Sequence, residues 1–506
     1  MNEAIEGQPV KSRAEALTNV AQAAAWSGGS VISSQVVGFL VLAVLARNLT
    51  ASDFGIVATV YVFVELARTL ILAGFPEYLI GRTTWDQRVA TSAFWLTLAN
   101  AAAVALIGLV AAALLEAWGN QPIALVLVAV LPTFFIDAAA AIPEASLRHQ
   151  FRFRLLSVRG SFAAIAGGLA ALLTLALGGG LWSLVSQRYV ASATYSLFNL
   201  IAARWLPTWP AATLVEMKSV FRSSVGIALS NILGMLNARA SDLIIASMSG
   251  PASLGLYQLA SRALFIILQV TTVPVQQIAL TSLGRVSSNY AGDEVRNLVQ
   301  ALSYVTFPLS LGLASIAPEF VAIVFGPRWT AAVLPMQITT LIGVPSTLSY
   351  LLNPALVSQR HSKILFRFTT LLVVVSVIFT AMATPFGVVW IATALLARSV
   401  LAAFVAALVL KSALGMSPLR LLVDLLPPAI ASILMVASVN VVRTLLPHST
   451  HQVMVAAVLV ASGSLAYAAI ILTFFRRQAL GAYRRIAPPP KTVTDTSPAT
   501  APANGR

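Results

Sequence analysis

Apolar stretches long enough to cross a lipid bilayer recur along the whole chain of 506 residues. A membrane-spanning helix needs roughly 20 consecutive, mainly apolar residues. The pattern predicts an all-α integral membrane protein with about fourteen transmembrane helices, in the ranges 20–46, 54–75, 90–115, 121–142, 160–178, 181–203, 222–248, 254–281, 297–317, 331–356, 365–384, 387–410, 421–442 and 453–475.

The polar connections between these stretches differ in charge from one side to the other. With the N-terminus inside and the connections alternating, the outside connections contain only Arg47, Arg328 and Arg443 as basic residues. Most of the other Lys and Arg residues then lie inside, and by the positive-inside rule both termini are cytoplasmic. A miscounted helix would scramble this alternation, so the charge pattern also supports the count.

Composition narrows the class of protein further. The chain is 58% hydrophobic and 10% charged, whereas soluble domains are roughly 25% charged. The net charge of +15 is explained by short loops at anionic lipid headgroups, so no nucleic-acid partner is expected. There is no Cys and only four scattered His, so we expect no metal site, no cofactor and no catalytic residues. The sequence contains no GxxxxGK[ST] loop, which argues against a built-in ATPase.

The second half of the chain repeats the first at a nearly constant offset. The segment 49–56 matches 249–256 at an offset of 200 residues, and 141–143 matches 352–354 at an offset of 211. Because six helices separate equivalent points, both copies have the same orientation in the membrane. Parallel repeats of this kind occur in transporters that hold a substrate between two bundles. Chance similarity between apolar helices is the alternative explanation.

This repeat predicts the domain organisation. We expect a cytoplasmic N-terminal segment, a first six-helix bundle, a cytoplasmic linker, a second six-helix bundle, two extra transmembrane helices, and a basic, disordered cytoplasmic tail. Their ranges are 1–19, 20–203, 204–221, 222–410, 411–475 and 476–506.

Eight ionisable residues fall inside the predicted spans, where a charge facing lipid is costly and usually lines a bundle interior or a wet cavity. They are Glu65, Arg68, Asp137, Arg188, Arg239, Asp242, Arg262 and Arg398. Together they carry a net charge of +2, which favours an anionic cargo.

Sequence spacing separates these residues into two groups. Glu65 with Arg68, and Arg239 with Asp242, are three residues apart, so each pair can form on one helix face. Such pairs either lock helices together or line a cavity, and the sequence leaves both interpretations open.

The other three arginines, Arg188, Arg262 and Arg398, have no acidic residue nearby in sequence. Asp137 is expected too near the cytoplasmic side to serve all three, so they favour a cavity role. Asn231 lies roughly on the same helix face as Arg239 and Asp242, and we expect it on the same wall.

Five segments resemble one known family, the Wzx-type polysaccharide flippases of the multidrug/oligosaccharidyl-lipid/polysaccharide exporter superfamily. The matching segments are Leu49–Gly55, Pro143–Arg154, Asn237–Ile245, Leu254–Arg262 and Phe325–Trp329. The resemblance implies two six-helix bundles around a central cavity, followed by two extra helices. It also implies a flippase that moves undecaprenyl-pyrophosphate-linked oligosaccharide across the bacterial inner membrane, for exopolysaccharide, capsule or O-antigen synthesis.

The resemblance also orders the candidate site residues. Arg239 and Arg262 lie within matching segments, whereas Arg188, Arg398, Arg68 and Asn231 are substrate-binding candidates from the membrane-burial argument. Candidate residues for coupling to H⁺ or Na⁺ are Glu65, Asp137 and Asp242. The expected partners are the lipid-linked oligosaccharide, membrane lipids and a polysaccharide polymerase or export machinery.

Three alternatives stay open. A cation-coupled multidrug antiporter shares the superfamily but favours a net negative cavity, and a lipid II flippase handles the same pyrophosphate lipid. A membrane-embedded polymerase or ligase needs catalytic groups at a membrane face, yet the expected outer loops hold only Asp53, Glu116 and Glu319 as acids.

Overall fold

The computed structural model describes residues 34–150, 152–208, 213–283, 288–359, 361–447, 451–476, 478 and 481. Within these ranges the chain is almost entirely helical. Three predictions lie outside the described residues: the N-terminal segment 1–19, the start of the first span at 20–33, and nearly all of the tail 476–506.

The helices follow the predicted apolar stretches closely. Before the first labelled helix lies a short apolar helix, Ser34–Asn48. The labelled elements are α2 (Ala51–Leu72), α3 (Phe75–Ile80), α4 (Gln87–Ala117), α5 (Gln121–Val130), α6 (Pro132–His149), α7 (Phe153–Ala176), α8 (Trp182–Ala203), α9 (Leu214–Leu283), α10 (Ser288–Ser315), α11 (Ala317–Val324), η1 (Pro327–Ala332), α12 (Val333–Leu341), α13 (Gly343–Ser358), α14 (Ser362–Ala383), η2 (Thr384–Phe386), α15 (Val388–Leu414), α16 (Pro418–Leu445) and α17 (Gln452–Phe474).

The chain is a multi-pass membrane protein. Eleven of the described helices are long and apolar enough to cross a bilayer, or twelve if the bent pair 327–341 and 343–358 is one span. The predicted count of fourteen is therefore not confirmed by length and composition. One helix outside the eleven is α8, whose polar residues include Gln187 and Arg188.

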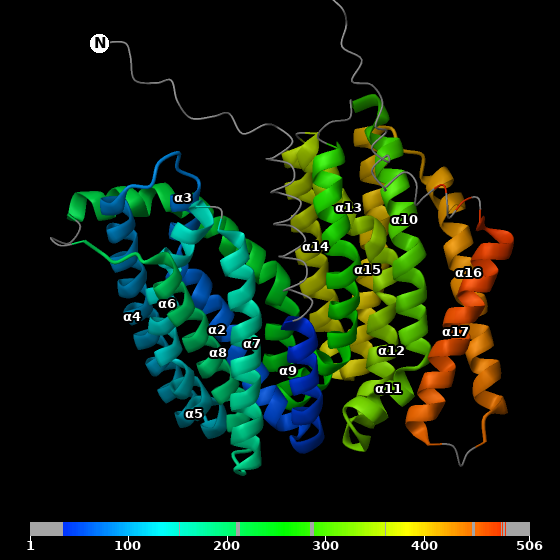
Figure 1. The fold of residues 1–506 in the computed structure, drawn as a ribbon, viewed down its shortest axis with the longest axis horizontal. Helices are drawn as coiled ribbons and strands as arrows, with labels where there is room; N and C mark the ends of the chain where they lie inside the picture. Colours follow the sequence, from blue (N-terminus) through cyan, green and yellow to red (C-terminus); the bar gives the residue numbers. More distant parts are fainter. Residues whose placement is uncertain are drawn as a thin grey trace, which may run out of the picture.

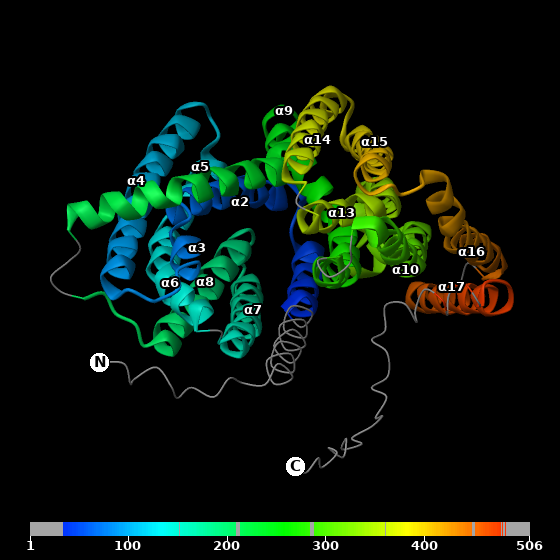
Figure 2. The same ribbon diagram turned by 90° about the horizontal axis from the view of Figure 1, so that it is seen from above.

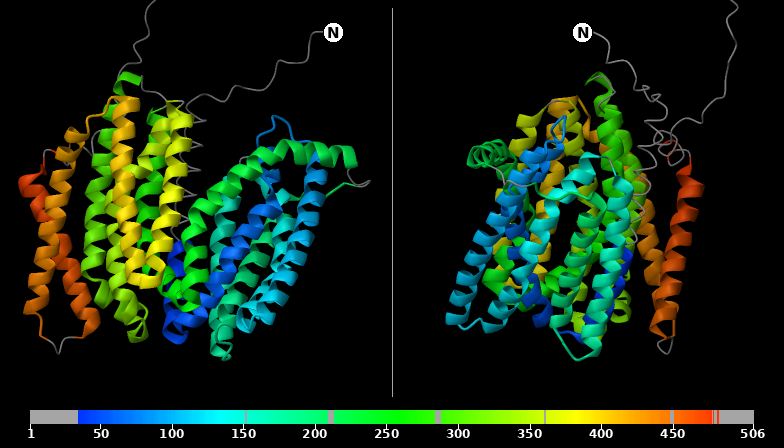
Figure 3. Two further views of the ribbon diagram at one scale, coloured as in Figure 1. Left: turned by 180° about the vertical axis from the view of Figure 1, so that it is seen from behind. Right: turned by 60° about the vertical axis from the view of Figure 1, so that its left-hand side comes forward.

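The helices form two lobes that lie side by side (Figure 1). The first lobe contains α2 to α8, the second contains α10 to α15, and α16 and α17 lie at the outer edge of the second lobe (Figure 2). α3 lies at the upper edge of Figure 1, whereas α5 and α11 lie toward the lower edge. Seen from behind, α9 runs between the lobes (Figure 3).

α9 consists of two arms rather than one continuous helix. Its backbone is non-helical at Gly250 (φ 78°, ψ 174°), a conformation that glycine adopts without steric cost. The predicted spans 222–248 and 254–281 lie on either side of this residue. The first arm packs on the first lobe, where Ile227 lies against Gly74 at the start of α3.

The lobes meet through a reciprocal helix crossing. A Cβ added at Gly55 would lie 1.7 Å from the carbonyl oxygen of Pro251, and one added at Gly255 would lie 2.3 Å from that of Ala51. Gly55 and Gly255, like Ala51 and Pro251, are equivalents at the 200-residue offset of the repeat. The contact is therefore nearly two-fold symmetric, and glycine is required because only a bare helix surface allows backbones this close.

Next to this crossing, the first helix is tied to the second lobe. The indole Nε1 of Trp329 donates to the carbonyl oxygen of Ala46 at 2.7 Å, and Arg47 Nε donates to that of Val324 at 3.3 Å. The Trp329 ring also meets Phe54 of α2 edge-on, at 5.4 Å between centroids. The segment 325–329 thus joins both lobes on one side of the molecule.

Equivalent breaks occur in the two halves. α6 follows a break at Leu131 and α13 follows one at Ile342, an offset of 211, and each helix contains a proline, Pro143 or Pro354. The structure thus places a proline-containing helix at equivalent positions in both lobes, although the 44° bend occurs only before α13 among the described helices. In the first lobe this helix carries charged residues, and in the second it belongs to an apolar core.

Candidate functional site

A cavity of about 220 Å³ lies within the first lobe, among α2, α3, α6 and α8. Its lining combines basic, acidic and apolar side chains. The polar lining residues are Arg68, Glu77, Asp137, Glu144, Arg148 and Tyr195. A polar cavity inside a membrane bundle is the usual place for charges that serve transport.

Local structure at the end of α2 brings α3 over this cavity. The chain leaves α2 through two residues in the left-handed region, Ala73 (φ 43°) and Gly74 (φ 74°). Asn100 of α4 donates to the carbonyl oxygens of Leu70 and Ile71, at 3.4 and 3.3 Å, and so satisfies groups that a helix end leaves free. Glu77 of α3 then reaches the cavity.

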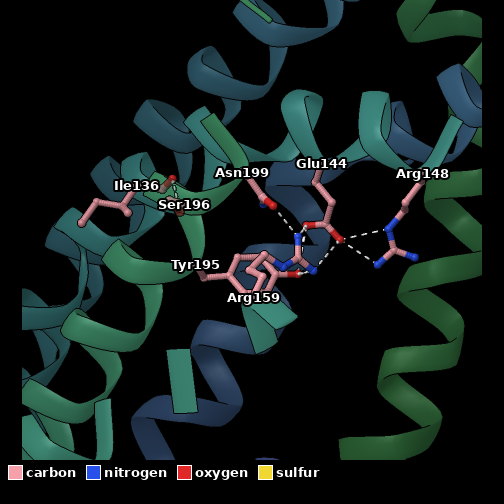
Figure 4. Close-up of polar contacts among 7 residues, drawn as sticks. All are labelled: Ile136, Glu144, Arg148, Arg159, Tyr195, Ser196 and Asn199. Carbon is pink, nitrogen blue, oxygen red and sulfur yellow. Dashed lines mark hydrogen bonds and ion pairs between the residues drawn. The ribbon is translucent and has the colours of Figure 1, made fainter. Parts of the chain in front are cut away.

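Glu144 is the centre of the charged network in this lobe (Figure 4). Its Oε1 accepts from Arg148 at 3.0 Å (Nε) and 2.7 Å (Nη2). Its Oε2 accepts from the Tyr195 hydroxyl at 3.0 Å and lies 3.4 Å from Nη1 of Arg159. Figure 4 shows Glu144 between the two guanidinium groups.

Arg159 is the most deeply buried charged residue of this network. Its side chain is 5% exposed, its guanidinium lies 3.6 Å from the centre of the Tyr195 ring, and its Nη1 donates to Asn199. Removing the partner of a buried charge costs far more than the pair itself contributes. Glu144 is therefore needed to compensate Arg159, besides facing the cavity.

These residues were missed by sequence analysis. The predicted spans ended at residue 142 and began again at 160, so Glu144, Arg148 and Arg159 were assigned to a cytoplasmic loop. The structure continues α6 to His149 and starts α7 at Phe153, so the predicted loop is wrong over these residues. The four-residue spacing of Glu144 and Arg148 was the available signal, since such pairs stabilise a helix.

Asp137 and Arg188 form an ion pair, with Arg188 Nη2 2.7 Å from Asp137 Oδ2. Ser192 of α8 also donates to Asp137. The expectation that Arg188 lacks an acidic partner is therefore wrong. Sequence distance was misleading because α6 and α8 pack together and bring residues 51 positions apart into contact.

Arg68 differs from its neighbours because it has no partner. It lines the cavity, yet among the described residues its guanidinium makes no hydrogen bond and no ion pair. The pairing of Glu65 with Arg68 that their spacing allows does not form, since no carboxylate in the described ranges lies within 4.0 Å of Arg68. Its donors are thus free for a ligand.

The predicted pair on α9 is confirmed. Arg239 Nη1 lies 3.1 Å from Asp242 Oδ2, and Gln258 donates to the same oxygen at 2.9 Å. Asn231 does not join this pair: its amide donates to Glu77 of the first lobe at 3.5 Å. Asn231 therefore lies beside the first-lobe cavity rather than on the Arg239 wall.

Arg262 and Arg398 have only neutral hydrogen-bond partners in the described part of the chain. Arg262 Nη2 donates to the side chain of Gln35 at 3.3 Å, and its guanidinium lies 5.4 Å from the Phe265 ring centre. Arg398 Nη1 donates to Ser376 at 3.3 Å. Neither guanidinium has an acidic partner in the described ranges, so the charge of each is available to an anion.

The repeat explains why Arg398 lacks an acid. At the offset of 210 it is the equivalent of Arg188, whose partner is Asp137. The equivalent of Asp137 at the offset of 211 is Leu348, a buried member of the second-lobe core. The two lobes thus place an arginine at the same position, one neutralised by a carboxylate and one not.

The fold and the charged cavity define a two-lobed membrane transporter architecture, and comparison with known proteins agrees. The profile of a family described as "Polysaccharide biosynthesis protein" matches residues 44–334, and the chain belongs to this family.

Three curated relatives carry related names. The chain is 23% identical over 339 residues to the teichuronic acid biosynthesis protein TuaB of Bacillus subtilis, covering 65% of this chain and 69% of TuaB. It is 25% identical over 311 residues to the succinoglycan biosynthesis transport protein ExoT of Rhizobium meliloti, covering 61% and 63%. It is 21% identical over 353 residues to the lipopolysaccharide biosynthesis protein WzxC of Escherichia coli, covering 68% and 71%.

Two solved structures share the fold. The lipid II flippase MurJ, in an inward closed conformation, superposes with a TM-score of 0.69 at 14% identity, over 89% of this chain and 99% of MurJ. A multidrug resistance MATE family transporter of the MOP superfamily, in an inward-facing conformation, gives 0.58 at 13% identity, over 75% and 94%. At these identities the likeness concerns the fold.

Proposed function

We propose that this protein translocates a polyprenyl-pyrophosphate-linked oligosaccharide from the cytoplasmic to the outer leaflet of the bacterial inner membrane. The observation that carries the proposal is a set of half-buried arginines, Arg68, Arg262 and Arg398, that have no acidic partner in the described part of the chain. The chain belongs to the polysaccharide biosynthesis family. A pyrophosphate needs several cationic hydrogen-bond donors, and the planar guanidinium matches phosphate oxygens better than an ammonium does.

The candidate arginines differ in how directly the structure supports a role in binding the pyrophosphate. Arg262 and Arg398 support pyrophosphate binding most directly, since each has only neutral hydrogen-bond partners in the described part of the chain. Arg68 has free donors inside the first-lobe cavity. Arg188 and Arg239 are already neutralised by Asp137 and Asp242, so we assign them a supporting role in shaping the walls.

The energy source and the orientation are parts of the same proposal. Asp137 and Asp242 are ion-paired, and Glu65 is not, so proton or sodium coupling would act by opening a pair or by loading Glu65. The charge bias of the loops supports cytoplasmic termini. The proposal also includes two repeated six-helix bundles followed by two additional helices. A polymerase would act on the exported units, and the chain itself is proposed to be a transporter and not an enzyme.

Reconstitution tests the function directly. Purified protein in liposomes is given a fluorescent polyprenyl-pyrophosphate oligosaccharide, and a glycan-modifying reagent added outside reports the leaflet. Protein-dependent exchange between leaflets is expected. Absence of exchange, together with proton-coupled efflux of cationic dyes by the same preparation, would support the antiporter alternative instead.

A further inference from the structure

We propose that the first-lobe cavity binds a sugar ring of the cargo, and that the pyrophosphate binds elsewhere, at the acid-free arginines Arg262 and Arg398. This inference rests on the proposed function and assigns separate parts of the substrate to separate parts of the protein. It follows from the charge of the cavity lining, from its hydrogen-bonding capacity, and from the corresponding region of the second lobe.

The charge of the lining disfavours a pyrophosphate. Two arginines, Arg68 and Arg148, face three carboxylates, Glu77, Asp137 and Glu144. Asp137 and Glu144 are also paired with Arg188 and Arg159, which do not line the cavity. Glu77 is therefore the lining carboxylate without an ion pair in the described part of the chain, and in a site of low dielectric constant it would repel a ligand with two or more negative charges.

The same groups suit sugar hydroxyls. A hydroxyl both donates and accepts, carboxylate oxygens accept at up to four positions, and a guanidinium donates at five. Arg68 uses none of its donors within the described structure, and Glu77 accepts only one long bond, from Asn231 at 3.5 Å. Charge-assisted bonds of this kind are roughly twice as strong as neutral ones.

The size of the cavity limits what it can hold. Its volume of about 220 Å³ is below the roughly 300–1,000 Å³ of pockets that enclose drug-sized ligands. One sugar ring is a reasonable occupant, whereas a whole repeat unit is not. The remaining sugars would then lie outside this cavity.

The second lobe shows that the polar lining is not a requirement of the fold. The equivalents of Asp137 and Glu144 at an offset of 211 are Leu348 and Ala355, and the equivalent of Tyr195 at 210 is Val405. All three belong to, or pack against, one apolar core. The equivalent helix of the second lobe, α13, thus forms without these charges, so the helix itself does not require them.

A purely structural role accounts for only part of the network. Glu144, Tyr195 and Asn199 together satisfy the buried Arg159. Arg68 and Glu77 contribute nothing to that pairing, and both face the cavity. Their positions are explained by a ligand that needs both donors and acceptors.

The test compares two lipids that differ only in the sugar. Protein in nanodiscs is titrated with undecaprenyl pyrophosphate and with the lipid-linked oligosaccharide extracted from the producing cells. Wild-type protein is expected to bind the second more tightly. Glu77→Gln should reduce binding of the oligosaccharide lipid about tenfold, as expected for one lost charge-assisted bond, and leave the binding of undecaprenyl pyrophosphate unchanged.

Two further variants serve as references. Arg262→Ala should weaken both lipids equally, because they share the pyrophosphate. Glu319→Gln, which alters a carboxylate paired with Arg443 in the second lobe, should weaken neither. Glu77→Gln is chosen because Glu77 makes no ion pair with the buried Arg159, so this change leaves the network around Arg159 intact.

The outcomes separate the inference from the function. If the wild type binds both lipids equally, or if Glu77→Gln weakens the binding of both lipids to the same extent or of neither, the sugar site is refuted while the flippase proposal stands. If the wild type binds neither lipid, both proposals are wrong.

Discussion

The two lobes of this protein have a similar arrangement of helices but differ in the side chains at equivalent positions. Arg188 and Arg398 occupy equivalent positions, yet Arg188 meets Asp137 at 2.7 Å and Arg398 meets Ser376 at 3.3 Å. Asp137 lines a charged cavity of the first lobe, whereas its equivalent Leu348 belongs to an apolar core of the second. Equivalent helices of a repeated fold can therefore bear charged side chains in one lobe and apolar ones in the other, because the backbone geometry depends on prolines, glycines and packing rather than on these charges.

The largest effect on folding is expected at the contact between the two lobes, the reciprocal crossing at Gly55 and Gly255. Gly55→Ala places a Cβ 1.7 Å from the carbonyl oxygen of Pro251, and a backbone atom cannot rotate away as a side chain can. We expect loss of the folded protein, measured as loss of the monodisperse peak after detergent extraction. Overpacking that forces backbone shifts costs typically 1–3 kcal/mol or more.

A matched glycine provides the control for this prediction. Gly226 is helical and has no atom within 4 Å of an added Cβ, so Gly226→Ala should be neutral or should stabilise the protein by roughly 0.5–1 kcal/mol. Equal behaviour of the two variants would show that the crossing is not closely packed.

The next largest effect is expected at Glu144. Glu144→Ala leaves Arg159, whose side chain is 5% exposed, without its acidic partner, and breaking a buried pair costs about 3–5 kcal/mol. Thermal unfolding in detergent should show the loss. The double variant Glu144→Leu with Arg159→Met should regain most of the stability, because apolar replacement of a buried pair is often neutral.

This double variant makes the first lobe resemble the second. If it unfolds as easily as Glu144→Ala alone, then the charges of the first lobe are required for folding. The conclusion that the backbone geometry does not depend on them would then be wrong.

A third prediction concerns the arginines without acids. Arg262→Ala and Arg398→Ala should each reduce translocation in liposomes at least about tenfold, which corresponds to about 1.4 kcal/mol, while the protein still inserts and folds. Arg420→Ala, at an exposed position near the start of α16, is the control and should keep full activity. Normal polymer output in cells that express Arg262→Ala or Arg398→Ala at the wild-type level would contradict a cationic binding site.

The smallest effect is expected for ion pairs away from the cavity. Glu319 and Arg443, 15% and 32% exposed, join α11 to α16 at 2.9 Å, and partly exposed pairs contribute about 0–1 kcal/mol. Glu319→Gln should therefore lower the unfolding temperature only slightly and leave translocation unchanged. A large transport defect here would mean that the two additional helices take part in the cycle.

Sequence patterns predicted much of the fold and less of the site. The apolar stretches located the helices, and the Arg239–Asp242 pair followed from its spacing on one helix. Glu144 and Arg159 were missed because predicted spans stop where charges begin. In the structure α6 and α7 continue through these residues, and Glu144, Arg159 and Tyr195 satisfy one another.

By itself the sequence determined that the chain crosses a membrane many times, and it predicted an internal repeat and arginines within the apolar stretches. These properties follow from local composition and from the periodicity of the sequence. Only the tertiary structure decided which arginines are neutralised, because Asp137 of α6 contacts Arg188 of α8, whereas Arg398 donates to Ser376. Partnership between distant residues depends on helix packing, and no spacing along the chain encodes it.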